Sequence, residues 1–201
     1  MAIQATATHG GPAHQTDESM SRGMAGMAFF IASEIMLFGG LFAGYFYVRG
    51  QASAWPPEGV HKLDAVTGGI LTALLLLSGV VAHFGVVGAK SGRQGQFILG
   101  MAIAMVMGTV FIAGQAYEWF SLMDEGLNAG STVYGSTFYV MTGFHGAHVI
   151  AGLLLLAVVL VRGFWRDFTP SRHLFVDAGV LYWHFVDVVW VFLYVILYVL
   201  V

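Results

Sequence analysis

Apolar residues follow one another in five long runs along this chain. The runs cover residues 24–48, 66–89, 97–120, 135–161 and 179–200, and neither Lys nor Arg occurs inside any of them. A helix needs about 20 predominantly apolar residues to cross the hydrocarbon of a bilayer, and each run reaches that length. The pattern therefore predicts an all-α polytopic membrane protein in which residues 24–201 form a bundle of five transmembrane helices.

The residues before the first run have a different character. Residues 1–23 are mostly small and polar and lack the apolar stretch of a secretory signal. Segments of this composition bury too little apolar surface to fold alone, so we expect a mobile N-terminal tail.

Composition narrows the class further. The chain is 58% hydrophobic and 9% charged, whereas a soluble domain has about 25% charged residues. The net charge is −3, which gives no reason to expect a nucleic-acid partner. The absence of cysteine excludes disulfides, thiolate metal sites and cysteine nucleophiles.

The basic residues predict the orientation in the membrane. If the N-terminus is cytoplasmic, the cytoplasmic side holds most of the Lys and Arg, and only Arg49 and Lys62 lie outside. Positive residues favour the cytoplasmic side, so we expect the N-terminus inside and the C-terminus outside. The predicted cytoplasmic residues are Arg22, Lys90, Arg93, Arg162, Arg166 and Arg172.

Small and aromatic residues add two expectations about packing. Small residues four apart let membrane helices approach closely, and they occur in three runs. Aromatic residues near the run ends are typical of anchors at the membrane interface. The small residues are Gly40 and Gly44; Gly100, Ala104 and Gly108; and Gly143, Ala147 and Ala151; the aromatic residues are Tyr45, Tyr47, Trp55, Trp119 and Trp165.

Six ionisable residues lie inside the runs and form a candidate buried polar network. A helix rises about 1.5 Å per residue, so Glu34 lies roughly 15 Å from the inner end of its run and His148 roughly 20 Å from the outer end of its own. Their similar depth predicts a Glu34–His148 hydrogen bond, with His145 as the alternative partner. Such groups serve either as contacts between helices or as a ligand or proton site. The six are Glu34, His83, His145, His148, His184 and Asp187, whereas Glu118 is expected near the outer interface.

Known cofactor patterns fit these residues poorly. A b-type haem needs two histidines that face each other from different helices, and His83, His148 and His184 lie at unequal predicted depths. His145 and His148 lie one turn apart on one helix, so they cannot bind one haem from its two sides. The runs contain neither the Glu-x-x-His motifs of a di-iron bundle nor the HExxH motif of a zinc protease. We therefore expect neither a metal ion nor a redox cofactor in this chain.

Four sequence blocks carry a family resemblance. They are FFIASEIMLFGGLFAGYFY (29–47), WPPEGVHKLD (55–64), YGSTFYVMTGFHGAHVIAG (134–152) and YWHFVDVVWVFLYVILY (182–198). In this order they resemble subunit III of the haem-copper terminal oxidases, and the resemblance runs from about Arg22 to the end of the chain.

The resemblance implies a function and a set of partners. The family's complexes, cytochrome c and quinol oxidases, reduce O2 to water and translocate protons during aerobic respiration. Subunit III carries no redox centre and is not itself catalytic. It packs mainly beside subunit I, with subunit II and small subunits nearby, and supports complex stability, proton uptake and binding of structural phospholipid. The haems and copper are expected in the partner subunits.

The resemblance also assigns roles by position. Glu34 is similar to the family's buried glutamate, His145 and His148 to its histidine pair, and His184 with Asp187 to its last-helix pair. Arg162 is similar to an arginine that meets lipid phosphate. Seven-helix members have two helices before the equivalent of Glu34, so this chain resembles the five-helix bacterial form, located in the inner membrane.

Three alternatives stay open at this point. The chain could be an accessory subunit of a nitric oxide reductase, a free-standing proton-coupled transporter or a haem-carrying membrane anchor. Mild-detergent purification distinguishes the oxidase subunit from the last two: the oxidase subunit comes with a large haem-copper partner, the transporter works alone and colourless, and the anchor is coloured by itself.

Overall fold

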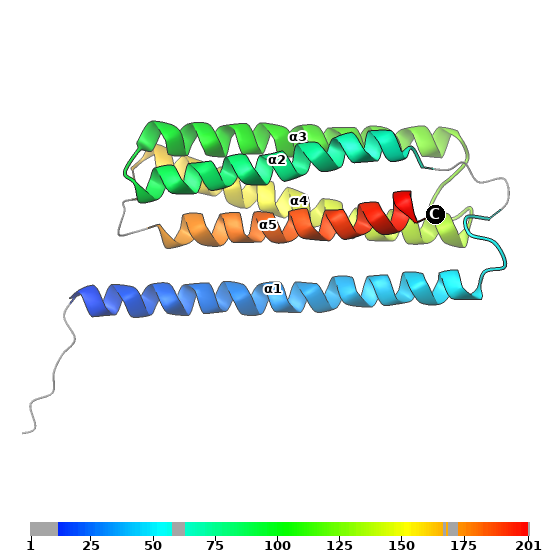
Figure 1. Cartoon of the computed structure of the whole chain (residues 1–201), viewed down its shortest axis with the longest axis horizontal. Coiled ribbons are helices and arrows are strands. Elements are labelled where there is room, and N and C mark those ends of the chain that lie inside the picture. Colours follow the sequence, from blue (N-terminus) through cyan, green and yellow to red (C-terminus); the bar gives the residue numbers. More distant parts are fainter. Residues whose placement is uncertain (1–11, 58–62, 167, 169–172, 201) are drawn as a thin grey trace, which may run out of the picture.

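Five long helices make up this protein in a computed structural model (Figure 1). The structure describes residues 12–57, 63–166, 168 and 173–200, with side chains from Arg22 onward in the first helix. All five helices are long and apolar enough to cross a membrane, and no strand occurs in these ranges. The predicted all-α, five-helix class is thus confirmed. The helices are α1 (Pro12–Gln51), α2 (Ala65–Lys90), α3 (Gln94–Asp124), α4 (Val133–Phe164) and α5 (Leu174–Tyr194), which continues into the π-helical turn η1 (Val195–Val199).

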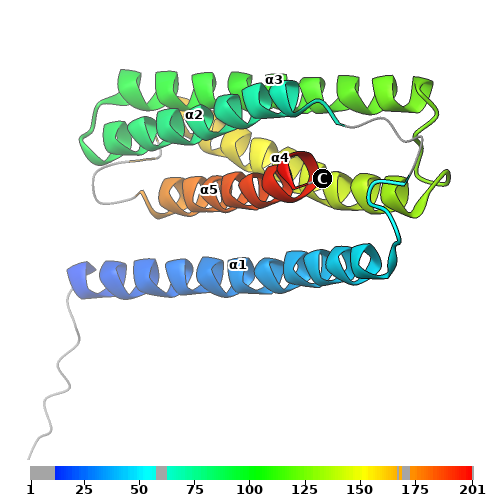
Figure 2. The same cartoon turned by 45° about the vertical axis from the view of Figure 1, so that its right-hand side comes forward.

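Successive helices run in opposite directions, so the connections gather at two ends of the bundle. One end holds the start of α1 and the α2–α3 and α4–α5 connections, and the other holds the α1–α2 and α3–α4 connections with the C-terminus (Figures 1 and 2). We call these the inner and outer ends, after the orientation that the basic residues predict.

The helices are longer than the predicted spans. α1 begins at Pro12 rather than at residue 24, and α3 continues to Asp124. A helix satisfies its own backbone hydrogen bonds, so it continues into polar surroundings beyond the apolar run. Residues 1–11 lie outside the described residues, and a mobile tail there stays a prediction.

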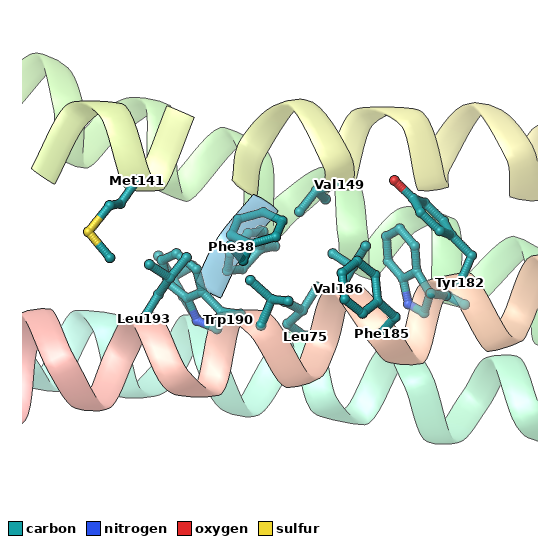
Figure 3. Close-up of a cluster of buried hydrophobic side chains, with 14 of the residues drawn as sticks. Phe38, Leu75, Met141, Val149, Tyr182, Phe185, Val186, Trp190 and Leu193 are labelled. Carbon is teal, nitrogen blue, oxygen red and sulfur yellow. The ribbon is translucent and has the colours of Figure 1, made fainter. Parts of the chain in front are cut away.

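The core lies among α2, α3, α4 and α5, and α1 lies to one side (Figures 1 and 2). Only 6% of the spanning window of α1 is buried, against 61% for the window of α5. Side chains of α5 fill the space against α4 and α2, as Figure 3 shows for Trp190 and Val186 of α5 beside Leu75 of α2. Phe38 reaches this cluster from α1 and is itself buried.

Hydrogen bonds from the indole rings of α5 tie it to α2. Trp183 Nε1 donates to Ser78 Oγ over 3.0 Å, and Trp190 Nε1 donates to Thr72 Oγ1 over 2.9 Å. Buried indole N–H groups need a partner, and each of these donors has one.

Glycine lets α2 and α3 touch backbone to backbone. A methyl group on Gly100 would lie 2.7 Å from both Cα and N of Gly85. This contact fits the close helix approach that the small residues Gly100, Ala104 and Gly108 predict. In contrast, nothing lies within 4 Å of the space that a side chain at Gly40 or Gly44 would occupy. These two glycines therefore make no close helix contact among the described residues.

Side-chain caps begin two of the helices. Asp64 Oδ1 accepts the Val66 N–H over 3.0 Å at the start of α2, and Thr132 Oγ1 accepts the Gly135 N–H over 3.0 Å at the start of α4. Such caps satisfy backbone donors that the first helical turn leaves free. The Thr67 hydroxyl and then the Val66 N–H hold the pKa of Asp64 below its usual value, so this cap stays ionised at neutral pH.

Aromatic residues at the outer end connect elements of the protein. Trp55 Nε1 donates to Tyr45 Oη over 3.0 Å, and Tyr45 Oη donates to the Ile196 carbonyl over 3.3 Å. Tyr45 is only 1% exposed, so the predicted interface-anchor role is wrong for this residue. Its hydroxyl instead ties α1 to the end of the chain.

Candidate functional site: ionisable residues inside the bundle

Glu34 of α1 and His148 of α4 contact each other inside the spanning region. His148 Nε2 lies 2.9 Å from Glu34 Oε2, so the structure joins the pair that matched depth predicts. The other ring nitrogen, Nδ1, lies 2.7 Å from the carbonyl of Phe144. Both nitrogens of this imidazole are therefore engaged.

The geometry limits where the protons of this pair lie. A carbonyl only accepts hydrogen bonds, so His148 Nδ1 carries a hydrogen. The contact between Nε2 and Glu34 then holds one further proton. Either a neutral Glu34 donates to Nε2, or an imidazolium Nε2–H donates to the carboxylate. In both forms the pair is neutral as a whole, which suits a low-dielectric environment.

Aromatic neighbours shield the pair. The Phe38 ring packs edge-on against the His148 ring with centroids 4.9 Å apart. The side chains of Glu34 and His148 are only 18% and 16% exposed. Tyr182 Oη of α5 donates to the His148 carbonyl over 3.3 Å, so the region joins α1, α4 and α5.

His145 lies in the core and is not the partner of Glu34. Its side chain stacks on Trp190 with centroids 5.0 Å apart and an angle of 29° between the rings. It is 1% exposed, and neither ring nitrogen has a hydrogen-bond partner among the described residues. The alternative that joined His145 to Glu34 is therefore wrong.

A third group spans α2 and α5. His184 Nδ1 lies 3.6 Å from Asp187 Oδ2, which is an ion-pair distance and too long for a hydrogen bond. The rings of His83 and His184 lie with centroids 6.3 Å apart. The Asp187 carboxylate fits against the backbone of Gly79, where any added methyl group would collide with Oδ2.

The six residues thus do not form one network among the described contacts. They divide into the Glu34–His148 pair, the isolated His145, and the group of His83, His184 and Asp187. Sequence depth alone could not separate them, because it gives height in the membrane but not the direction in which a side chain points around its helix.

A fourth polar cluster, not predicted from the sequence, lies near the outer end. Tyr198 Oη donates to Glu118 Oε2 over 2.6 Å, and Gln115 Nε2 donates to the same oxygen over 3.1 Å. Glu118 lies near the outer end of α3, as expected, but its side chain is turned into the bundle and is only 8% exposed. The signal was present: Gln115 and Glu118 are three residues apart and so share one face of α3.

Arg162 ends α4 beside two aromatic rings. Its guanidinium carbon lies 5.4 Å from the ring centroid of Phe168 and 5.2 Å from that of Phe175. These distances fit cation–π contacts. The two rings hold this positive charge at the inner end of the bundle.

Metal and haem ligation find little support in this geometry. The residues with described positions contain no group of three or more His, Cys, Asp or Glu that could hold a metal ion. His148, one candidate haem ligand, has no nitrogen left for iron, because Glu34 and the Phe144 carbonyl occupy both.

These features define a class: a polytopic helical membrane protein whose ionisable side chains bind one another between helices. A model of the family described as cytochrome c oxidase subunit III matches residues 3–201. The chain belongs to the cytochrome c oxidase subunit III family.

Curated relatives come from distant organisms. The chain is 40% identical over 176 residues to cytochrome c oxidase subunit 3 of Corynebacterium diphtheriae, covering 86% of this chain and 85% of that protein. It is 40% identical over 182 residues to the protein of the same name from Synechocystis, covering 88% and 75%. For the subunit 3 of Branchiostoma lanceolatum the identity is 40% over 179 residues, covering 86% and 67%.

Proposed function

We propose that this chain acts as subunit III of a bacterial haem-copper oxidase, a membrane complex that reduces O2 to water and translocates protons. It packs beside subunit I, and the haems and copper lie in partner subunits. The chain itself is not catalytic; it stabilises the complex, binds lipid and supports proton uptake by subunit I. The observation that carries this proposal is the Glu34–His148 pair, an ionisable contact between helices rather than a ligand set.

The pair supports a local proton-holding role and not a proton path through this chain. In either form of the pair a single proton lies between Glu34 Oε2 and His148 Nε2, and the pair is neutral as a whole. The far nitrogen, Nδ1, faces a backbone carbonyl that cannot accept the proton onward. The pair therefore serves as a clamp between α1 and α4.

Orientation and lipid binding follow from the charges. Lys90, Arg93 and Arg166 belong to the helix ends and connections of the inner end, Arg22 lies in the inner half of α1, ten residues from its start, and Arg49 lies at the outer end. This distribution supports an inner-membrane protein with a cytoplasmic N-terminus and an outer C-terminus. Arg162, also at the inner end, is a candidate contact for a lipid phosphate. Lys62 and Arg172 lie outside the described residues.

Purification of the tagged chain from native membranes in a mild detergent tests the function. We expect the tagged chain to come with a large subunit that shows haem absorbance. We also expect the purified complex to reduce O2. Recovery of a colourless chain that transports protons alone in vesicles would favour the transporter, and a Soret band in the isolated chain would favour the haem anchor.

Replacement of Glu34 tests the clamp. We expect Glu34→Ala to weaken retention of this chain in the complex more than it lowers initial turnover. The loss of one hydrogen bond inside a membrane protein destabilises it by about 0.6 kcal/mol on average and by about 1.7 kcal/mol at most. The measurement is the fraction of purified complexes that keep the chain, together with initial O2 reduction.

Two variants complete this test. Glu34→Gln keeps a hydrogen-bonding side chain opposite His148 and is expected to retain more of the chain than Glu34→Ala. Ser33→Ala is the matched control, because among the described residues the exposed Ser33 hydroxyl bonds only to the Phe30 carbonyl of its own helix. Immediate and complete loss of activity in an intact Glu34→Ala complex would contradict a supporting role.

A further inference from the structure

Polar residues of α2 and α5 line a seam that opens on the outside of the bundle. At the inner end, Lys90 Nζ lies 3.0 Å from Asp177 Oδ1, and because charged groups avoid hydrocarbon we take this pair as the edge of the membrane. His83 lies seven residues before Lys90, and His184 lies seven residues after Asp177. The two helices are antiparallel, so this equal spacing brings both imidazoles to the same height. We call His83, His184 and Asp187 the polar seam.

The seam lies inside the hydrocarbon layer. Seven residues of helix span about 10 Å and make about two turns, so the imidazoles lie on the same helix faces as Lys90 and Asp177 but two turns deeper. Exposed apolar side chains surround them at this depth. These are Val80, Phe84 and Val188, with 66%, 54% and 53% of their surface exposed.

The seam is polar, partly exposed and incompletely bonded. The His184 side chain is 41% exposed, and His83 is exposed as well. Asp187 is buried beneath them, and its Oδ1 has no hydrogen-bond partner among the described residues. His184 turns Nδ1 toward Asp187, so its Nε2 is directed away from that carboxylate and is available to another group.

Physical chemistry limits what covers such a surface. Imidazoles and carboxylates are unfavourable against lipid tails, which offer no hydrogen bonds. A lipid headgroup stays at the membrane edge, about 10 Å away along the helix. A second copy of this chain in a symmetric contact would set the same groups against each other, imidazole to imidazole. A different membrane-spanning helix with its own polar side chain fits best.

We propose that the polar seam is the docking surface for a transmembrane helix of the haem-bearing partner subunit. This helix presents a hydroxyl, amide or carboxyl side chain at the height of His83 and His184. The inference rests on the proposed function, since it needs that partner. It adds which face of this chain meets the partner: the α2–α5 face, on a side of α5 different from the one where Phe185 and Phe192 pack against α1.

Photo-crosslinking in native membranes tests this placement. The probe is p-benzoylphenylalanine at position 80, one turn from His83, and the matched control is the same probe in place of Val110, an exposed valine of α3. We expect an adduct with the haem-bearing subunit from position 80 and none from position 110. An adduct with a second copy of this chain, or only with lipid, overturns the proposal.

A paired substitution gives an independent measurement. We expect His83→Leu with His184→Leu to lower retention of the chain in the purified complex about sevenfold, the effect of two average hydrogen bonds inside a membrane. Thr109→Leu, on the exposed face of α3, is expected to leave retention unchanged. Unchanged retention in the paired variant overturns the proposal.

Co-purification tests the proposed function, whereas crosslinking from position 80 tests the docking face, so the two can fail separately. If the tagged chain never comes with a haem-bearing subunit, the proposed function fails. If it does so while position 80 gives no adduct with that subunit, only the docking face is wrong. The crosslink uses both histidines intact, so it does not depend on folding of the paired variant.

Discussion

Gly100→Ala is expected to destabilise the folded chain by about 1–3 kcal/mol, the usual range for an extra methyl group in a well-packed core. The new carbon would lie 2.7 Å from Cα and N of Gly85 and 3.0 Å from the Val81 carbonyl oxygen. All three are backbone atoms, so no side chain can rotate away, and α2 and α3 must move apart. The effect outweighs the gain in helix propensity that alanine normally brings.

A buried cysteine reports the unfolding. The chain has no cysteine, so Val159→Cys, at a position with 0% exposure, provides its single thiol. The temperature at which a thiol dye labels this chain in the detergent-solubilised complex gives the apparent stability. Gly146→Ala is the control, because nothing lies within 4 Å of its added methyl group; we expect it to be neutral or slightly stabilising. Equal midpoints for the two variants would contradict a backbone contact at Gly100.

Glu118→Leu is expected to destabilise the outer half of the bundle by about 1–3 kcal/mol, the range for leaving a buried polar group without a partner. Glu118 Oε2 accepts from both Tyr198 Oη and Gln115 Nε2. Its loss leaves a phenol and an amide without this acceptor in a region where all three residues are buried. The same thiol-labelling temperature measures the change.

A second substitution distinguishes the loss of the acceptor for the Tyr198 hydroxyl from a general packing defect. Tyr198→Phe removes the donor and keeps Gln115 on Glu118, so we expect a loss of about 1 kcal/mol, the net value of one hydrogen bond. The combination of Glu118→Leu with Tyr198→Phe is expected to be less harmful than the sum of the two, because the stranded hydroxyl is gone. Strict additivity would indicate that the two side chains do not act together.

The sequence predicts the fold well because apolar length alone selects membrane helices. Five runs became five helices, and their directions alternate because each helix crosses the bundle from one end to the other before the next begins. The ends were predicted less well: α1 continues back to Pro12, since helical hydrogen bonding does not stop where the apolar run does.

Packing partners were only partly predictable. Equal depth correctly joined Glu34 to His148, since both groups need a partner at the middle of the membrane. Depth did not show that His145 turns into the core against Trp190, because rotation about a helix axis depends on the neighbouring helices. The same holds for small residues. A methyl group added at Gly100 would collide with Gly85, whereas one added at Gly40 or Gly44 would have no atom within 4 Å.

α1 lies to one side of the bundle and depends on a small number of contacts with the other helices. The helix has little buried surface of its own, so the few specific contacts fix its place. They include the Glu34–His148 pair near the middle, the contacts of Phe38 and Phe42 with α5, and the Tyr45 and Arg49 bonds at the outer end, where Arg49 donates to the Leu200 carbonyl over 2.7 Å.

The distribution of haem after this chain is removed from the purified complex tests the central claim most directly. The claim is that its acids and imidazoles hold helices together and bind no prosthetic group. We predict that the released chain shows no Soret absorbance and that all haem stays with the remaining subunits, which still reduce O2 at first. Haem that leaves with this chain would contradict the account.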